Sequence, residues 1–143
     1  MAVEAYINFN GNCREAVEFY AQVFETEKPQ IMAYGDTPPD PGFPLTEETK
    51  NLVMHTQLKI SGSNVMFSDV PPGMPLVVGN NISLTIISKN MDEIKSLFIK
   101  LKEGGSVGMD LQETFWSKCY GFITDKFGIP WQFNFDSGQP MGM

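Results

Sequence analysis

The sequence has little of what several classes of protein require. It holds two cysteines, Cys13 and Cys119, which are too few for a disulfide framework, so we expect reduced thiols in a cytosol. No run approaches the roughly 20 apolar residues that cross a bilayer. The first residues show neither the basic nor the apolar region of a signal peptide. We therefore expect a cytoplasmic protein with no membrane partner.

Basic residues are also scarce. Ten Lys and Arg stand against 17 Asp and Glu, which gives a formal net charge of −7. Binding to a phosphate backbone needs clustered Lys and Arg, so we expect no nucleic-acid partner. What is present is typical of a globular protein, because 42% of the 143 residues are hydrophobic and 12% are aromatic. This length fits one domain of ordinary size.

The chain contains two similar halves. Asn12 with Glu15, and Asn90 with Glu93, have the spacing of a helix N-terminal capping box. The apolar residues behind each cap recur at helical spacing and match at a constant offset of 78: Ala16, Phe19, Tyr20 and Val23 against Ile94, Leu97, Phe98 and Leu101. A strand is predicted before each helix, over residues 6–9 and 81–88. This internal repeat predicts two tandem modules.

Three further strands follow the first helix, over residues 30–34, 52–60 and 64–69. Three more are expected after the second helix, the last two over residues 116–124 and 129–135 around a turn at 125–128. A Pro-rich linker at 71–75 separates the two βαβββ modules, about 1–75 and 76–143. One module has a single helix to cover its sheet, so two modules or two chains must share faces. The predicted fold is α+β: one domain, 1–143, with a curved, cleft-bearing mixed sheet and helices on its outer face.

An irregular segment interrupts the first module at residues 35–49. It contains four prolines and four acidic residues and shows no periodicity. A loop of this length is often a lid over a binding site or an interface element. It is as often a tolerated, solvated insertion. The sequence leaves both interpretations open.

Several segments carry a resemblance to a known family. The tandem βαβββ pair, together with residues 6–13, 112–116, 120–121 and 125–131, resembles the PhnB-like branch of the vicinal-oxygen-chelate superfamily. That superfamily includes glyoxalase I, extradiol dioxygenases and bleomycin-resistance proteins. Members of the branch often carry a demethylubiquinone methyltransferase label. We do not expect methyl transfer here, because no Gly-rich loop follows a strand in a Rossmann-like βαβ unit.

The resemblance also implies where a metal would bind. In metal-dependent relatives the ligands come from the first and last strands of each module. By register these positions are Ala5, Phe67 or its neighbour Met66, Asn81 and Gln132, and no shift by one residue produces a His/Glu set. Apolar side chains cannot bind a hard divalent ion, and amide oxygens are weak ligands without a carboxylate beside them. We expect no catalytic metal and no cofactor.

His55 is the only histidine, and alternation places it with Gln57 on a polar strand face. It could be a donor or general base in a cleft, or an ordinary surface histidine. Cys13 falls at the first helical position, where a helix N-terminus lowers a thiol pKa. A Cys13–His55 nucleophile pair is one hypothesis, and a small buried residue is the other; Cys119 is expected in the core.

The resulting hypothesis is a homodimeric, PhnB-like protein that binds a small, partly apolar organic molecule in the concave sheet. Its candidate ligand-binding residues are His55, Gln57, Asn81, Trp116, Tyr120 and Gln132. Three alternatives remain open at this point. They are a metal-dependent lyase or dioxygenase of the same fold, a protein that sequesters a cationic drug, and a purely structural dimer.

Overall fold

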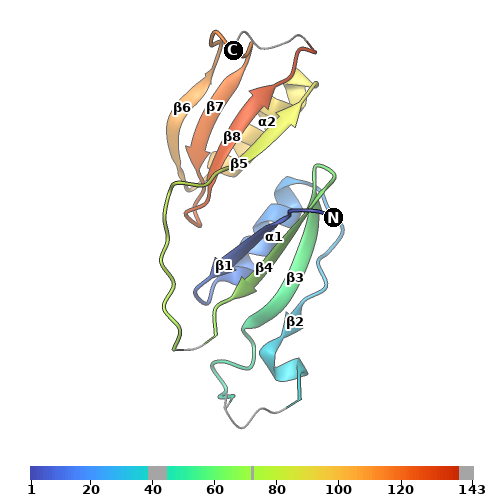
Figure 1. The fold of residues 1–143 in the computed structure, drawn as a ribbon, viewed down its shortest axis with the longest axis vertical. Coiled ribbons are helices and arrows are strands. Elements are labelled where there is room, and N and C mark those ends of the chain that lie inside the picture. Colours follow the sequence, from blue (N-terminus) through green and yellow to red (C-terminus); the bar gives the residue numbers. More distant parts are fainter. Residues whose placement is uncertain (39–44, 72, 139–143) are drawn as a thin grey trace. The chain divides into compact units, whose positions relative to one another are not determined.

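The computed structural model describes residues 1–38, 45–71 and 73–138 of the 143-residue chain. The chain divides into two compact units, unit 1 (Met1–Val77) and unit 2 (Val78–Met143). In each unit one helix lies on one face of a four-stranded sheet (Figure 1). Among the described residues, none of the helices has the length and apolar character that crossing a bilayer requires.

Unit 1 consists of β1 (Ala5–Phe9), α1 (Cys13–Val23), β2 (Met32–Ala33), a single 3₁₀ turn η1 (Tyr34–Asp36), β3 (Val53–Ile60) and β4 (Ser63–Asp69). Unit 2 consists of β5 (Leu84–Ser88), α2 (Met91–Lys102), β6 (Ser106–Gln112), β7 (Tyr120–Thr124) and β8 (Pro130–Phe135). The sheet orders are β1-β4-β3-β2 and β5-β8-β7-β6. In both sheets the first strand is parallel to the last, and the other pairs are antiparallel.

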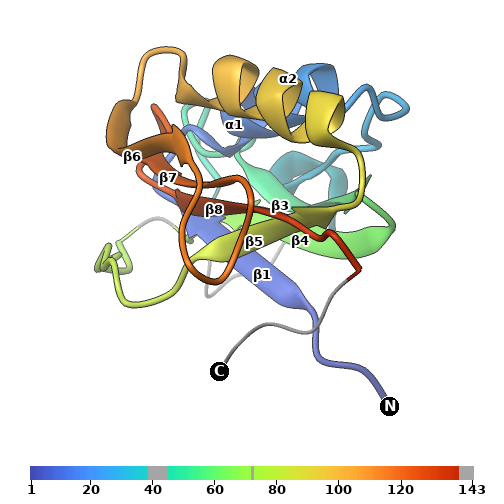
Figure 2. The same ribbon diagram turned by 90° about the horizontal axis from the view of Figure 1, so that it is seen from above.

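The predicted α+β fold of two tandem βαβββ modules is confirmed. The two helices begin at Cys13 and Met91, which preserves the offset of 78 seen in the sequence. Both sheets are mixed, and their strands follow the same spatial order. Figure 2 shows α1 and α2, each on one face of the sheet of its own unit. The last hairpin of each unit turns at a glycine with positive φ, Gly62 at +85° and Gly128 at +88°. That the two units work as one domain stays a prediction.

The apolar stripes of the helices form the core of each unit. In unit 1, Ala16, Val17 and Tyr20 are fully buried, and the Tyr20 ring stacks on Phe67 of β4 with centroids 5.8 Å apart. In unit 2, the Phe98 ring of α2 meets Phe133 of β8 edge-on at 5.2 Å. The helical periodicity therefore identified the buried residues of α2, and in α1 it identified all but Cys13 and Val17 while including the half-buried Phe19. The opposite face of each sheet carries no helix of its own unit.

The two helices begin in different ways. Asn90 Oδ1 accepts a hydrogen bond from the Glu93 amide at 3.2 Å, so the predicted cap of α2 is confirmed. The predicted cap at Asn12 is wrong, because its side chain makes no capping bond. Asp69 Oδ1, at the end of β4, accepts instead from the amides of Gly11 at 2.8 Å and Cys13 at 3.0 Å. A buried carboxylate is a stronger partner for a helix N-terminus than an exposed amide.

Two predicted strands were too long at their N-terminal ends, and both errors affect candidate residues. β5 begins at Leu84, so Asn81 lies outside it. β7 begins at Tyr120, so Trp116 lies in the preceding loop. There the chain turns, because the Thr114 amide donates to the Ser117 carbonyl at 2.8 Å and the Ser117 amide donates to Thr114 Oγ1 at 3.2 Å. Within the irregular segment and the linker, residues 39–44 and 72 lie outside the described structure.

Candidate functional site

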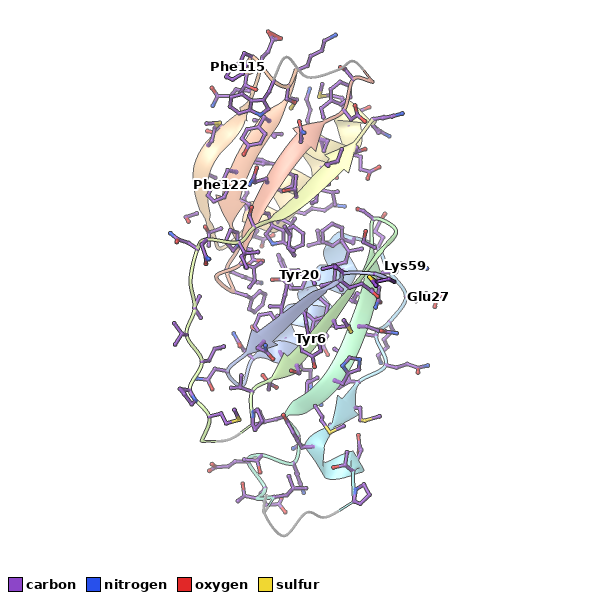
Figure 3. The ribbon with its side chains drawn as sticks, viewed as in Figure 1. Tyr6, Tyr20, Glu27, Lys59, Phe115 and Phe122 are labelled. Carbon is purple, nitrogen blue, oxygen red and sulfur yellow. The ribbon has the colours of Figure 1, made fainter. Side chains whose placement is uncertain are left out.

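The helix-free face of the unit 2 sheet, here called the open face of unit 2, combines amides with aromatic rings. Along β8, Trp131 and Phe133 are buried on the side of α2, so alternation turns Gln132 and Asn134 to the open face. Phe122 lies opposite Gln132 in β7, and Tyr120 lies opposite Asn134. Residues directly opposite in an antiparallel pair share a face. Two amides and two aromatic rings therefore form one patch (Figure 3 labels Phe122).

A chain of hydrogen bonds fixes the central amide of this patch. The Tyr120 hydroxyl donates to Gln132 Oε1 at 2.5 Å, and Gln132 Nε2 donates to Ser83 Oγ at 2.7 Å. Burial raises the pKa of the Tyr120 hydroxyl above its ordinary value, so this group stays a donor well above neutral pH. Both ends of the Gln132 amide are thus held before any ligand arrives. One Oε1 lone pair and one Nε2 hydrogen remain for another partner.

Aromatic rings extend this patch into the loop before β7. The Trp116 ring meets the Tyr120 ring edge-on, with centroids 5.3 Å apart. Phe115 in turn meets Trp116 edge-on at 4.8 Å. Phe115 is 83% exposed, which is unusual for a large apolar side chain, and Figure 3 shows it projecting from unit 2. The loop therefore presents aromatic surface next to a polar group of fixed orientation.

Asn134 adds an unsatisfied acceptor to the same face. Its Oδ1 atom is buried and has no hydrogen-bond partner among the described residues. A buried acceptor without a donor is destabilising, and such atoms are uncommon in native structures. A bound molecule that brought an N–H or O–H group to this position would satisfy it.

The candidate residues of unit 1 border a groove beside β3. The groove has a volume of about 1030 Å³; residues 26–32 form one wall, and His55, Gln57, Lys59 and Asn64 lie among the others. The Tyr6 hydroxyl lies 3.4 Å from His55 Nδ1, and the two rings are 5.9 Å apart. Gln57 Oε1 accepts from Asn64 Nδ2 at 3.2 Å. His55 and Gln57 therefore border one groove, as their shared strand face indicated.

The structure groups the six candidate residues unevenly. Trp116, Tyr120 and Gln132 form one connected set in unit 2, and His55 and Gln57 lie together in unit 1. Asn81 is exposed, and no described hydrogen bond joins it to the set in unit 2. Sequence reasoning missed Phe122, Asn134 and Ser83. Strict alternation in β7 and β8 could have found the first two, whereas only the folded structure brings Ser83 to Gln132.

The residues at the family's metal positions do not fit a divalent ion. Ala5 has no donor atom, and Phe67 is fully buried in the core. Asn81 is predicted in the fifth strand, but β5 begins at Leu84, and the residue of β5 opposite Gln132 is Thr85. Within residues 1–38, 45–71 and 73–138, no three side chains of His, Cys, Asp or Glu come together in a way that could hold a metal. The side-chain oxygens of Ser83, Tyr120, Gln132 and Asn134 belong to amides and hydroxyls, which are weak ligands without a carboxylate.

Of the two hypotheses for Cys13, the small buried residue is confirmed, and activation of its thiol by the helix N-terminus is not supported. Cys13 is fully buried, and this burial, together with the nearby Asp69 carboxylate, raises the pKa of its thiol to about 12. Burial therefore outweighs the effect of the helix N-terminus. No hydrogen bond in the described structure joins Cys13 to His55. Cys119 is also buried, which confirms its predicted place in the core, and burial raises its pKa too.

Solved structures of other proteins share the tandem βαβββ fold. A glyoxylase/bleomycin resistance protein/dioxygenase domain from Frankia sp. EAN1pec has 12% identity and a TM-score of 0.65, covering 94% of this chain and 96% of that one. A mutant of the fosfomycin resistance protein FosX from Listeria monocytogenes, complexed with Mn(II), has 10% identity and a TM-score of 0.62, covering 94% and 90%. At these identities the likeness shows the fold alone.

Closer relatives define the family. The family model described as 3-demethylubiquinone-9 3-methyltransferase matches residues 2–134, and the chain belongs to this PhnB-like family. Protein YjdN of Escherichia coli K12 is 32% identical, covering 98% of this chain and 99% of its own. Protein PA1353 from Pseudomonas aeruginosa is 33% identical with a TM-score of 0.81, covering 95% and 98%. The PhnB protein from Bacillus cereus is 24% identical with a TM-score of 0.73, covering 95% and 100%. The predicted membership is confirmed.

Proposed function

We propose that this protein binds a small, partly apolar organic molecule on the open face of unit 2 and does so without a catalytic metal. The observation that carries the proposal is the Tyr120–Gln132–Ser83 hydrogen-bond chain beside Trp116. Small-molecule sites usually combine apolar and aromatic surface with a few polar groups of fixed orientation. This patch has that composition. The proposal includes a cytoplasmic location and a homodimeric state, as expected from the sequence.

Each component of the patch has a distinct role in such binding. A planar part of the ligand would pack against the rings of Trp116 and Tyr120. Gln132 would hydrogen-bond a polar substituent through its remaining lone pair or hydrogen. Because Tyr120 and Ser83 already hold this amide, binding loses little of its side-chain entropy. Asn134 Oδ1 would favour ligands with an N–H or O–H donor.

The metal-dependent alternative has little support from the patch itself, because Ser83, Tyr120, Gln132 and Asn134 offer amide and hydroxyl groups. Methyl transfer has equally little support. The loop before α1 holds a single glycine, Gly11, and the loop before α2 holds none. A nucleotide-type cofactor is usually cradled by a Gly-rich loop at such a junction. Binding without group transfer is therefore the function that the patch supports best.

Tryptophan fluorescence gives a direct test. Trp131 is only 2% exposed, and its Nε1 donates to Asp125, whereas Trp116 is partly exposed, so a soluble quencher such as iodide reports mainly on Trp116. Hits from a fragment screen by thermal shift should protect Trp116 from iodide. Trp116→Ala and Gln132→Ala should each weaken binding about tenfold, which corresponds to about 1.4 kcal/mol.

The control is Ile99→Ala, which truncates an apolar side chain that is 62% exposed on α2. Its affinity for the same hits should equal that of the wild type. Hits that bind Trp116→Ala and Gln132→Ala as tightly as the wild type would refute this location of the site. The homodimer is tested separately by sedimentation velocity, where a species of one chain's mass at micromolar concentration would contradict it.

A further inference from the structure

The groove beside β3 has an unpaired strand edge along one side. β2 pairs with β3 only at Met32–His55 and Ala33–Val53, so the edge of β3 beyond His55 has no partner strand on that side. The opposite wall is the connection of residues 26–31, which runs beside this edge (Figure 1). The Thr56 hydroxyl donates to the Gln30 carbonyl at 2.9 Å and joins the two walls at one end. The groove is therefore a built feature of unit 1.

Strand register shows which backbone groups face this groove. Ile60 and Ser63 flank the two-residue turn that joins β3 to β4, so they form a hydrogen-bonded pair. Hydrogen-bonded and non-hydrogen-bonded pairs alternate along an antiparallel ladder. The backbone N–H and C=O groups of Gln57 and Lys59 consequently both point away from β4, toward the groove. No strand of the described structure lies across from them.

The side chains around the groove are also rich in donors. Asn64 satisfies Gln57 Oε1, which leaves the Gln57 Nε2 amide group as a donor. Lys28 and Lys59 each contribute an ammonium group. His55 lies beside them; if the Tyr6 hydroxyl donates to Nδ1, the imidazole proton is on Nε2, which is then a further donor. Glu27 and the backbone carbonyl groups of the β3 edge are acceptors in the same groove, so the two ammonium groups are what favours an anion there.

The charge of the groove is opposite to that of the whole chain. Its lining holds two lysines and one carboxylate, Glu27, so two positive charges less one negative leave +1 with His55 neutral, against −7 for the chain. Figure 3 shows Lys59 and Glu27 in unit 1. The one ion pair in the described residues joins Glu47 to Lys50, so neither Lys28 nor Lys59 is paired there. An anion entering this groove would meet unneutralised ammonium groups.

From the unpaired N–H groups and the local positive charge, we propose that this groove is a second binding site, for small anions that carry a carboxylate or phosphoryl group. Both groups offer several acceptor oxygens to the backbone N–H and ammonium donors of the groove. The groove is larger than a single such group needs, so the anion can be part of a larger molecule. This site lies wholly in unit 1, and it does not depend on the proposed function in unit 2.

The single histidine makes the test specific. The Cε1–H resonance of His55 needs no assignment and reports on the groove by NMR. Inorganic phosphate, benzoate and tetramethylammonium chloride should be titrated separately at fixed pH and ionic strength. We expect a saturable shift with a dissociation constant of about 1–10 mM for at least one anion and none for the cation. Saturation by phosphate alone or by benzoate alone identifies the preferred group. Shifts that remain linear with every probe would overturn the proposal.

Charge-matched variants separate a local site from general electrostatics. The double variant Lys28→Gln/Lys59→Gln should weaken anion binding at least fivefold. The control Lys89→Gln/Lys100→Gln removes the same charge from exposed positions in unit 2 and should leave the affinity unchanged. Equal losses in the two variants would show a net-charge effect and refute the site. Trp116 quenching, measured in the same samples, follows the unit 2 site independently, so the two proposals can fail separately.

Discussion

Replacing Asp69 by Asn should destabilise the protein far more than the loss of one surface charge would. The Asp69 side chain is 1% exposed, and it accepts hydrogen bonds from three backbone amides. Gly11 and Cys13 donate to Oδ1 at the start of α1, and Val53 donates to Oδ2 at 2.9 Å at the start of β3. One carboxylate therefore connects the beginning of α1 with the start of β3 and the end of β4, two strands that are distant from α1 in the sequence.

The magnitude follows from what an amide can still do at this position. In its better orientation, the side-chain oxygen of the Asp69→Asn variant keeps the bonds from Gly11 and Cys13. Its NH₂ group then faces the Val53 amide, so two donors oppose each other. The loss of one charge-assisted hydrogen bond costs about 1.5–3 kcal/mol, and the weakening of the other two adds to it. We expect the free energy of unfolding to fall by about 3 kcal/mol, a large share of the roughly 5–15 kcal/mol typical of a domain.

Urea unfolding followed by circular dichroism measures this change. The matched control is Asp36→Asn, which removes an exposed carboxylate whose Oδ2 accepts one bond from the Ala33 amide at 2.9 Å. Its effect should stay within about 0.5 kcal/mol. Hydrogen exchange should show the greatest loss of protection at the Val53 amide. If Asp69→Asn costs no more than Asp36→Asn, the carboxylate does not organise unit 1 and the reasoning fails.

Three further predictions use the same protein preparations. Asn90→Ala should lower the free energy of unfolding by about 1 kcal/mol and Asn12→Ala by less than about 0.5 kcal/mol, because only the Asn90 side chain makes a capping hydrogen bond. A larger loss for Asn12→Ala than for Asn90→Ala would contradict this assignment. Cys13 should not react with a soluble disulfide reagent near neutral pH. The pKa of the Cys13 thiol is about 12 in the folded protein and 9.0 ordinarily, so unfolding between pH 9 and pH 12 releases a proton. In that range the free energy of unfolding should fall with rising pH by about 1.4 kcal/mol per pH unit more in the wild type than in Cys13→Ala. An equal pH dependence in the two proteins would contradict this. Mass spectrometry should find well under one metal ion per chain and EDTA should not change the melting temperature, whereas a stoichiometric ion with destabilisation by EDTA would favour the metal-dependent enzyme.

Much of the fold could be predicted because its signals are local and occur twice. The apolar stripes of α1 and α2 have helical period. In α2 the buried residues are the ones that this period selected, whereas in α1 Val17 is buried in addition and Phe19 is only half-buried. The hairpin turns at Gly62 and Gly128 follow from residue type, since both adopt positive φ. The repetition at an offset of 78 then made each half support the other.

The errors arose where a distant residue or a short turn decides the structure. Asn12 has the residue type and spacing of a cap, yet Asp69, from the far end of the unit, occupies that role. Trp116 has a strand-forming side chain, but the bonds between Thr114 and Ser117 bend the chain before β7. No local pattern reveals either event. Family membership came from motifs spread over nearly the whole chain, which a few local errors do not affect.

The candidate site could be predicted from the sequence only in part, as the fold could. Alternation placed Gln132 on the polar face of β8, and the structure keeps it there beside Tyr120. Asn81 entered through a register carried over from relatives, and the structure puts Thr85 opposite Gln132. Ser83 could not be predicted, because its contact with Gln132 requires the two ends of the unit to meet. For this site, strand alternation therefore placed residues more accurately than the register carried over from relatives did.

The two buried carboxylates of the described residues explain why binding is a better proposal than catalysis. Asp69 accepts from three backbone amides. Asp125 accepts from the amides of Phe127 and Ile129 and from Nε1 of Trp131. Each carboxylate is occupied by N–H donors that hold strands or turns in place. Metal ligation and general acid–base catalysis often use carboxylates in a cleft. The carboxylates of Asp69 and Asp125 instead accept hydrogen bonds that stabilise the fold. On the open face of unit 2, the proposal of binding rests on the amides, hydroxyls and aromatic rings of the patch around Gln132.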